Sequence, residues 1–437
     1  MAISLSGITF IGRTSAGKQA SPFWIATLAE ANDAAEGIAT DASGNMYVTG
    51  YTFTGGINQM FLLKLDSGAN IVWQRALSNG AGMFGKDVTV AASGNVYVAV
   101  SGNGAGGMPD FYTAKYTPSG TLVWLRKLYS NSAFDNIYSI ATDASDNVYV
   151  TGFSDASGDQ QLLIARYDSG GDLAWMKHYG GGSFDHGYSV AVDSTGAIYV
   201  AGKVQSAGPA QSNMLLVKYN VTSGALVWQR ILGSAYSDEA RGIAIDSSDN
   251  IYITGQTYST DTSSTMIVTA KYDSDGTLIW QVQLDGAQTQ YGISIDTDSS
   301  NNVYVAGISY AGSGPSDEVA IVKYNSAGSL QWQRILGSTG SENPPGIAID
   351  SDGNVCIATG TYVGSPVKVL VAKLPSDGTL TGTYGSFTYA TTTYTAAAAT
   401  LTDSTPSLSS ADASLTPDSS PSYTTPTAAF VATVINM

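Results

Sequence analysis

The sequence repeats itself at an interval of about 50 residues, and this periodicity restricts the fold more than any other feature. Its clearest copy runs from Gly242 to Gln281 and contains four short runs of β-branched and aromatic residues. Asp, Ser, Asn and Gly separate these runs, as expected for strands joined by tight turns. A repeat of this length with four strands predicts one blade of a β-propeller.

Two aromatic positions count the copies. The second expected strand carries Tyr47, Tyr97, Tyr149, Tyr199, Tyr252 and Tyr304, with Cys356 in the last copy, at intervals of 50 to 53 residues. The outermost expected strand carries the seven tryptophans of the chain, spaced 49 to 53 residues apart: Trp24, Trp73, Trp124, Trp175, Trp228, Trp280 and Trp332. Both series predict an all-β protein, a propeller of seven four-stranded blades. A buried indole needs a partner for its N–H group, so we expect each tryptophan to dock between neighbouring blades.

The tryptophan series begins one copy early. Trp24 precedes the first tyrosine, and the seventh copy has Gly382 where a tryptophan is expected. We therefore expect residues 21–26 to form the outermost strand of the blade that residues 346–376 complete. This N-terminal strand would close the ring and remove an exposed sheet edge.

The two ends of the chain differ from the repeats. We divide the chain into an N-terminal arm at residues 1–20, the propeller at residues 21–383 and an extension at residues 384–437. No Lys or Arg follows Lys373, and the extension is rich in Thr, Ser, Ala and Pro. Such a composition does not build a core. We expect it to become ordered against the N-terminal arm or a neighbouring subunit and to anchor the protein there, while a fragment of residues 21–383 remains a folded monomer.

Composition excludes several classes of function. The chain of 437 residues has 19 basic and 35 acidic residues, a formal net charge of −16. This balance argues against binding to a nucleic-acid backbone, which requires clustered Lys and Arg. No apolar run is long enough to span a membrane, and the first residues do not resemble a secretion signal.

The repeats resemble a known family. Segments such as Trp175–Gly202 and Trp332–Gly360 resemble the SBBP-type repeat, which is named for a seven-bladed β-propeller, and the inner strands are similar to NHL-type repeats. The resemblance covers roughly residues 21–381 and implies the propeller fold. Members of the family are mostly surface, secreted or envelope-associated proteins of bacteria and phages and share no single activity.

Other propeller signatures fit less well. The chain lacks the Trp-Asp pair of WD-repeats, and the spacing of Thr277 and Trp280 departs from the sialidase Asp-box. A quinoprotein docking motif is approached by Ala270, Asp273 and Trp280, but the Asp is one place late. We therefore expect no quinone or other cofactor.

A basic residue recurs once in the third strand of every blade: Lys64, Lys115, Arg166, Lys218, Lys271, Lys323 and Lys373. These residues could form a positive ring for an anionic ligand. Alternatively, each pairs with an acidic turn residue such as Asp246 or Asp273, or extends from a packed strand to solvent.

Three further groups of residues invite a functional interpretation. Asp296, Asp298 and Asn301 lie in a turn that could hold Ca²⁺, although Asp and Asn are also what tight hairpin turns require. His178 and His186 flank Asp185, which suggests acid–base chemistry but lacks a nucleophile. Cys356 takes a strand position and is expected to be a buried thiol. We expect no catalytic, cofactor or metal site, with Ca²⁺ at the turns as the open alternative.

The segments between blades are rich in Gly, Ser, Tyr and Asn, which suits contacts with sugars or proteins. Our first hypothesis is a non-enzymatic structural or recognition protein of a virus particle, such as a bacteriophage tail, fibre or capsid-surface component. Its propeller would face outward and bind the host surface, including surface glycans, while residues 1–20 and 384–437 contact other virion or envelope proteins. The alternatives are a bacterial extracellular or envelope adhesin and a polysaccharide hydrolase or lyase.

Overall fold

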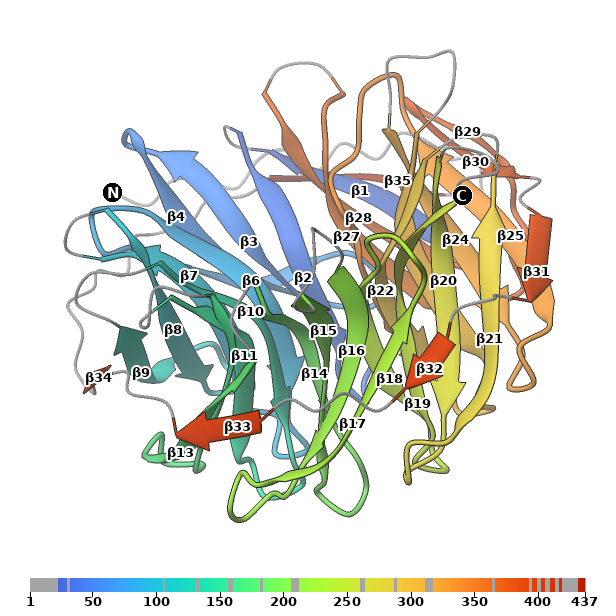
Figure 1. Cartoon of the computed structure of the whole chain (residues 1–437). Helices are drawn as coiled ribbons and strands as arrows, with labels where there is room; N and C mark the ends of the chain where they lie inside the picture. The colour runs from blue at the N-terminus through green and yellow to red at the C-terminus, as the bar shows by residue number, and fades with distance from the viewer. Residues whose placement is uncertain are drawn as a thin grey trace.

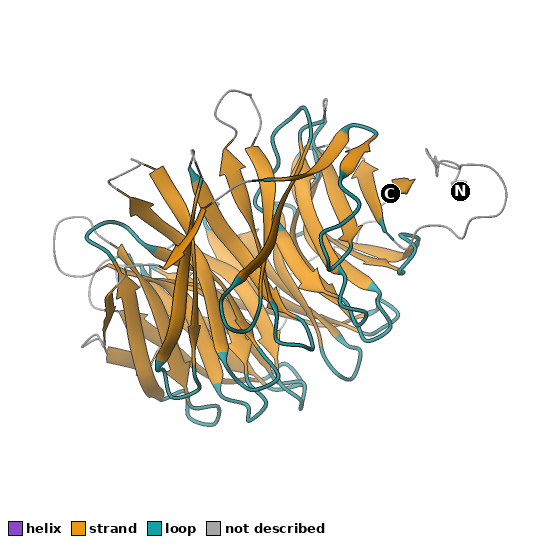
Figure 2. Ribbon diagram, turned by 90° about the vertical axis from the view of Figure 1, so that its right-hand side faces the viewer, coloured by secondary structure: helices purple, strands orange, loops and turns teal. Residues whose placement is uncertain are grey.

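The computed structural model describes residues 23–29, 32–104, 107–129, 134–155, 160–180, 184–205, 212–259, 264–286, 289–310, 317–363 and 366–392, and five later strands between residues 395 and 436. These residues form strands and turns, with no helix among them and hence none able to cross a membrane. Seven antiparallel sheets surround a central axis (Figures 1 and 2). This arrangement confirms the predicted seven-bladed β-propeller.

Six blades are continuous in sequence, and their strands run from the axis outward in chain order. Blade 1 contains β2 (Ala34–Thr40), β3 (Met46–Thr54), β4 (Ile57–Leu65) and β5 (Ile71–Leu77). Blade 2 contains β6 (Met83–Val90), β7 (Val96–Asn103), β8 (Pro109–Tyr116) and β9 (Leu122–Tyr129). Blade 3 contains β10 (Asp135–Thr142), β11 (Val148–Ser154), β12 (Gln161–Tyr167) and β13 (Leu173–Gly180).

The second half of the ring repeats this pattern. Blade 4 contains β14 (His186–Val192), β15 (Ile198–Gln205), β16 (Ser212–Tyr219) and β17 (Leu226–Gly233). Blade 5 contains β18 (Glu239–Ile245), β19 (Ile251–Ser259), β20 (Ser264–Tyr272) and β21 (Leu278–Asp285). Blade 6 contains β22 (Gln290–Thr297), β23 (Val303–Tyr310), β24 (Asp317–Tyr324) and β25 (Leu330–Gly337).

Blade 7 is built from both ends of the chain. Its three inner strands are β26 (Gly346–Ile349), β27 (Val355–Thr361) and β28 (Lys368–Leu374), and the fourth is the N-terminal strand β1 (Trp24–Ala29). β1 pairs antiparallel with β28. The predicted closure of the ring by an N-terminal strand is confirmed.

Strands from the C-terminal region form an outer layer that the sequence did not predict. The hairpin of β29 (Gly382–Tyr384) and β30 (Phe387–Thr391) adds to blade 6 through β25. β31 (Thr395–Ala398), β32 (Thr402–Ser404), β33 (Ser409–Asp412) and β34 (Thr416–Asp418) then add to blades 5, 4, 3 and 2. β35 (Val431–Asn436) pairs with β1. Figure 1 shows β31, β32 and β33 in red along the outside of the ring.

From its composition, the extension is expected to become ordered against the N-terminal arm or a neighbouring subunit. The described tail strands pair with the outer strands of their own propeller, and in the described part of the chain only blade 1 keeps four strands. The expected N-terminal arm at residues 1–20 lies outside the described residues.

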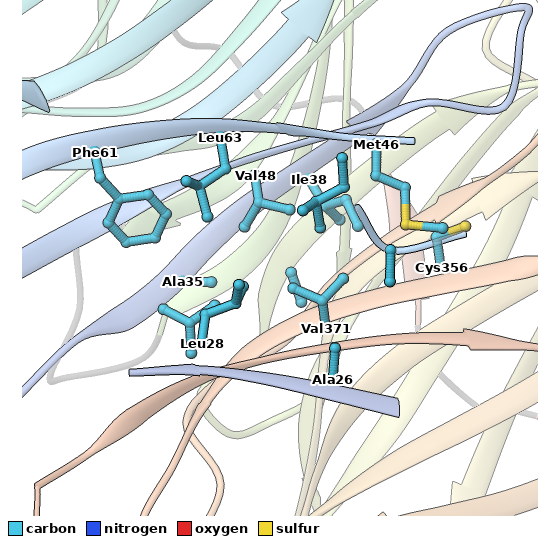
Figure 3. Packing of buried hydrophobic residues seen from close by; sticks show 14 of the residues in the cluster. Ala26, Leu28, Ala35, Ile38, Met46, Val48, Phe61, Leu63, Cys356 and Val371 are labelled. Carbon is cyan, nitrogen blue, oxygen red and sulfur yellow. The ribbon is translucent and has the colours of Figure 1, made fainter. Parts of the chain in front are cut away.

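The hydrophobic core lies between the blades. Second strands such as β7 and β11 and third strands such as β20 are buried on both faces because neighbouring sheets cover them. Between blades 7 and 1, Val371 and Leu28 pack with Val48 and Phe61 (Figure 3). Cys356 belongs to the same cluster and is fully buried, as predicted, and burial raises the pKa of its thiol.

The turn between the first two strands explains the repeated tyrosine. In blade 5, one carboxylate oxygen of Asp246 accepts hydrogen bonds from the backbone N–H groups of Ser248 and Asn250, both at 2.9 Å. Its other oxygen accepts the Tyr252 hydroxyl at 2.8 Å. Asp249, the fourth residue of the turn, has a left-handed φ of 59°, which Asn, Asp and Gly tolerate best. Asp, Asn and Tyr therefore recur together because one side chain organises the turn.

Candidate functional site

All seven tryptophans dock one blade onto the next. Each indole N–H donates to a backbone carbonyl in the turn that follows the third strand of the next blade, at 3.0 to 3.4 Å. The acceptors are the carbonyls of Ser67, Pro118, Ser169, Val221, Ser274, Ser326 and Ser376. A turn residue with a left-handed φ lies against the ring; Gly276, for example, leaves only 3.1 Å between an added Cβ and the Trp228 ring.

The seven repeated basic residues lie directly opposite the tryptophans on the neighbouring strand. Three of them form ion pairs with turn carboxylates: Lys64 with Asp41 at 3.5 Å, Lys271 with Asp246 at 3.6 Å and Lys373 with Asp350 at 2.7 Å. Asp273 instead accepts hydrogen bonds within its own turn. The amines of Lys115, Lys218, Lys271 and Lys323 donate to turn carbonyls of the next blade. These positions are in the blade walls, outside the lining of the central cavity.

The structure does not bring the other candidates together into a reactive site. His186 stacks on Phe153 with ring centroids 4.3 Å apart and contacts Gln160. Burial and the charge of Lys203 lower its pKa to about 4. Burial also lowers the pKa of His178, while Asp185 accepts the backbone N–H of Gln205.

In the turn considered for Ca²⁺, both carboxylates already accept hydrogen bonds from protein groups. Asp298 accepts hydrogen bonds from the backbone N–H groups of Ser300 and Asn302 and from the Tyr304 hydroxyl. Asp296 accepts the N–H of Ile349 at 2.7 Å. Among the residues described, no cluster of three or more His, Cys, Asp or Glu side chains could hold a metal ion.

A different set of residues emerges at the axis. The first strands of all blades surround a cavity of about 840 Å³. In each of blades 1 to 6 the first strand contains a β-bulge at the same place, where one residue is skipped in the pairing with the second strand. The extra residues are Glu36, Lys86, Tyr138, Tyr188, Arg241 and Ile293, and Pro345 is the equivalent in blade 7. All seven line the cavity, and we call them the bulge ring.

The bulge ring differs chemically around its circumference. In blades 1 and 2, the Lys86 amine forms an ion pair with Glu36 at 2.7 Å. In blades 3 to 5, Tyr138 and Tyr188 have ring centroids 5.2 Å apart, and the Arg241 guanidinium lies 4.4 Å from the centre of the Tyr188 ring. Ile293 and Pro345 make the remaining side apolar. A repeated fold thus carries an asymmetric site at its centre.

Arg241 and Lys203 pair with the same carboxylate, that of Glu239. Glu239 pairs with Arg241 at 2.6 Å and with Lys203 at 3.1 Å. Burial opposes ionisation of Glu239, but these two cations outweigh it and hold its pKa below the usual value. Burial, reinforced by Tyr188, raises the pKa of Tyr138 to about 12. At neutral pH the Glu239 carboxylate is therefore ionised, and the Tyr138 phenol beside the site is neutral.

Deeper in the channel, two carboxylates join neighbouring blades. Asp87 accepts hydrogen bonds from the Ser139 hydroxyl at 2.8 Å and the Ile140 N–H at 3.1 Å. Asp296 connects blades 6 and 7 through Ile349. Burial raises the pKa of both carboxyl groups to about 6, despite these hydrogen bonds.

Exposed apolar and aromatic side chains lie at one end of the blades. Segments between blades and connections between second and third strands are joined there by backbone hydrogen bonds, for example from the Asp238 N–H to the Ser212 carbonyl. This end, which we call the loop face, carries eight large apolar side chains that are 38 to 55% exposed: Phe53, Met108, Phe134, Phe184, Tyr236, Tyr258, Tyr310 and Tyr362. Tyr236 and Tyr258 form a pair with ring centroids 5.4 Å apart.

Sequence reasoning identified the docking residues and missed the bulge ring. The sequence does contain one signal for the bulge ring: in the first strand of each copy, one position differs in chemistry between copies. This position comes immediately before Gly37, Asp87, Ser139, Ser189, Gly242, Ser294 and Gly346. Its significance depends on the bulge, which pattern alone does not reveal.

The repeated blades and their docking contacts define a seven-bladed β-propeller with a site on its axis. A family model described as a β-propeller repeat, SBBP, matches residues 227–261. The matched residues contain most of β17 and all of β18 and β19, so this stretch of the chain is similar to an SBBP-type repeat.

Further comparisons give distant similarities. A stretch is 25% identical to an uncharacterised WD repeat-containing protein of Acanthamoeba polyphaga mimivirus, covering 33% of this chain and 14% of that protein. Among solved structures, the phage phi92 endosialidase has a TM-score of 0.46 at 10% identity, covering 81% of this chain and 69% of that one. Sqt1 from Chaetomium thermophilum has a TM-score of 0.44 at 12% identity, covering 78% and 96%. Structural likeness at this level carries no functional information.

Proposed function

We propose that this protein is a non-enzymatic recognition protein of a virus particle, most simply a bacteriophage tail, fibre or capsid-surface component, and that its loop face binds the host surface. One observation carries the recognition role. The docking residues repeat in all seven blades, whereas the bulge ring places a different side chain in each of several blades around one cavity. β-Bulges re-aim side chains and are frequent next to functional sites.

The exposed side chains of the loop face support this assignment. Eight large apolar or aromatic side chains are exposed on this face, and exposed apolar groups often mark binding surfaces. Tyrosines such as Tyr236 and Tyr258 combine a rigid apolar ring with a polar hydroxyl, which suits contact with glycans or proteins.

The proposal that the protein belongs to a virus particle rests on sequence similarity and not on the bulge ring or the loop face. The resemblance to SBBP-type repeats includes phage proteins, and a viral protein matches a third of this chain. We propose that residues 1–20 and 384–437 contact neighbouring virion proteins. The outermost strands β29 and β31 to β35 present sheet edges to which a neighbouring strand could add.

Two measurements test the proposal. Mass spectrometry of purified particles should detect the chain, and absence from particles would favour the alternative of a bacterial extracellular or envelope adhesin. The purified protein should bind host cells, and Tyr138→Ala with Tyr188→Ala should abolish that binding. Val123→Ala with Val227→Ala is the matched control, because these exposed residues lie on outer strands. Equal loss in both variants would contradict a site at the axis.

A polysaccharide hydrolase or lyase is the second candidate. It is favoured by Asp87, a cavity-lining carboxyl whose pKa of about 6 would suit a general acid. Its oxygens, however, accept hydrogen bonds from the next blade. Release of reducing ends from a host polysaccharide, abolished by Asp87→Asn, would establish this activity.

A further inference from the structure

The few basic residues of this acidic chain are distributed unevenly. Seven lie opposite the tryptophans, and five more lie two places after a tryptophan: Arg75, Arg126, Lys177, Arg230 and Arg334. In the described part of the chain, the basic residues at neither docking position are Lys86, Lys127, Lys203, Arg241 and Lys368. Lys86 and Arg241 line the axial cavity, and Lys203 shares a carboxylate with Arg241. Of the five basic residues at neither docking position, three therefore lie at the axial cavity or pair with a residue that lines it.

The positive charge around Arg241 is only partly balanced. The two cations Arg241 and Lys203 share one carboxylate, that of Glu239. This group of three carries one net positive charge. The ion pair of Lys86 with Glu36 is balanced by itself. A second anion beside Arg241 would complete the pairing.

Arg241 also has a free hydrogen-bond donor. Its Nε–H is buried and has no acceptor among the described residues. Buried polar groups are normally paired, and a guanidinium binds a carboxylate most favourably through two parallel hydrogen bonds. The side chain is 36% exposed, so a ligand can approach it from the channel.

Aromatic rings adjoin this charge. The Arg241 guanidinium lies over the Tyr188 ring, and Tyr138 of blade 3 contacts Tyr188 with its ring plane tilted by 50°. Both rings line the cavity. A pyranose ring has an apolar face of C–H groups and a rim of hydroxyls, so a phenol matches both its face and its polar edge. The cavity of about 840 Å³ is of the size that holds an oligosaccharide segment rather than a single ion.

We propose that the bulge ring binds a saccharide that carries a carboxylate, with the carboxylate held by Arg241 and Lys203 and the sugar ring against Tyr138. The inference rests on the proposed recognition function and names the ligand class of the same site. Lys86 and Glu36, on the opposite side of the cavity, would hydrogen-bond to the hydroxyl groups of an adjacent sugar.

A glycan array tests the proposal directly. The full chain is applied to uronate- and sialate-terminated oligosaccharides, to their neutral counterparts and to dextran sulfate. We expect binding to at least one carboxylated glycan and not to its neutral counterpart. Arg241→Gln should weaken that binding by about tenfold or more, since it removes a charge-assisted pair. Tyr138→Ala should weaken it as well. Lys368→Gln removes one positive charge from the start of β28, outside the cavity lining, and should leave binding unchanged.

The possible outcomes separate this inference from the proposed function. Equal binding to dextran sulfate and to carboxylated glycans, with equal losses in Arg241→Gln and Lys368→Gln, would show unspecific attraction and overturn the inference. Binding to neutral glycans that is lost in Tyr138→Ala would overturn the carboxylate assignment and leave the recognition function standing. If no glycan binds, the inference fails, and host-cell binding by the same variants then decides the proposed function.

Discussion

Trp24 lies directly opposite Lys373 across the antiparallel pair of β1 and β28. In blade 5 the same register places Trp280 opposite Lys271. The closing blade thus reproduces, with a strand from the other end of the chain, the contact that a continuous blade makes. β1 is held on both sides, by β28 and by β35, so the two ends of the chain meet in one sheet.

Removing β1 should open the ring. We expect deletion of residues 1–29 to lower the thermal unfolding midpoint far more than deletion of residues 1–22, which retains β1. The longer deletion removes pairing with both β28 and β35 and takes Trp24, Ala26 and Leu28 out of the core between blades 7 and 1. Differential scanning calorimetry measures both midpoints. Equal midpoints would show that β1 does not close the ring.

The tryptophans should differ in their contribution to stability. Trp24 is 2% exposed, so Trp24→Ala should lower the free energy of unfolding by about 3–5 kcal/mol. Trp228 is only partly buried, and Trp228→Ala should cost less. Trp228→Phe keeps a ring but loses the hydrogen bond to the Ser274 carbonyl, worth about 1 kcal/mol. Denaturant unfolding gives all three values, and a loss for Trp24→Ala below that for Trp228→Phe would contradict the docking role.

Asp87 and Asp296 should contribute a rise in stability as the pH falls from 8 to 5, which the lowered pKa of His186 opposes. Burial raises the pKa of Asp87 and Asp296 to about 6, above their values in the unfolded chain. The folded state therefore binds protons that the unfolded state does not, and protonation in this range stabilises it. Below about pH 4, stability should fall as the pH falls further. Turn carboxylates such as Asp246 have lowered pKa values, and they lose their stabilising interactions when they are protonated.

Thermal melts at pH 8, 5 and 3 test this dependence. Asp87→Asn with Asp296→Asn should flatten the rise between pH 8 and 5. Asp275→Asn with Asp352→Asn removes two negative charges from exposed turns and should retain it. An equal slope in both double variants would attribute the rise to the net charge of the whole protein.

The tail strands should protect sheet edges. In a fragment of residues 21–383, six blades lose the strand that pairs with their outer edge. The sequence suggested that such a fragment is monomeric, but the structure leads us to expect that it folds and self-associates, because free edges pair with one another. Sedimentation velocity over a range of concentrations compares the fragment with the full chain. A fragment that stays monomeric would show that the tail has no such role.

The repeated residues made the fold predictable. The same contacts recur from blade to blade. A tryptophan such as Trp228 docks onto the next blade, a basic residue such as Lys218 lies opposite it, and a tyrosine such as Tyr252 binds the aspartate of its turn. The early start of the tryptophan series predicted the closing strand for the same reason. The pairing of the tail was not predictable, because short segments rich in Thr, Ser and Ala take their structure from the edge that receives them.

The sequence by itself determined the number of blades, their order and the closure of the ring, since these follow from local patterns repeated seven times. Only the tertiary structure decided where the site lies. A β-bulge is a shift in register between two strands, so it places Tyr138, Tyr188 and Arg241 on the axis only once their sheets have formed and packed. These residues are about 50 positions apart in the chain, and their proximity results from the closed ring.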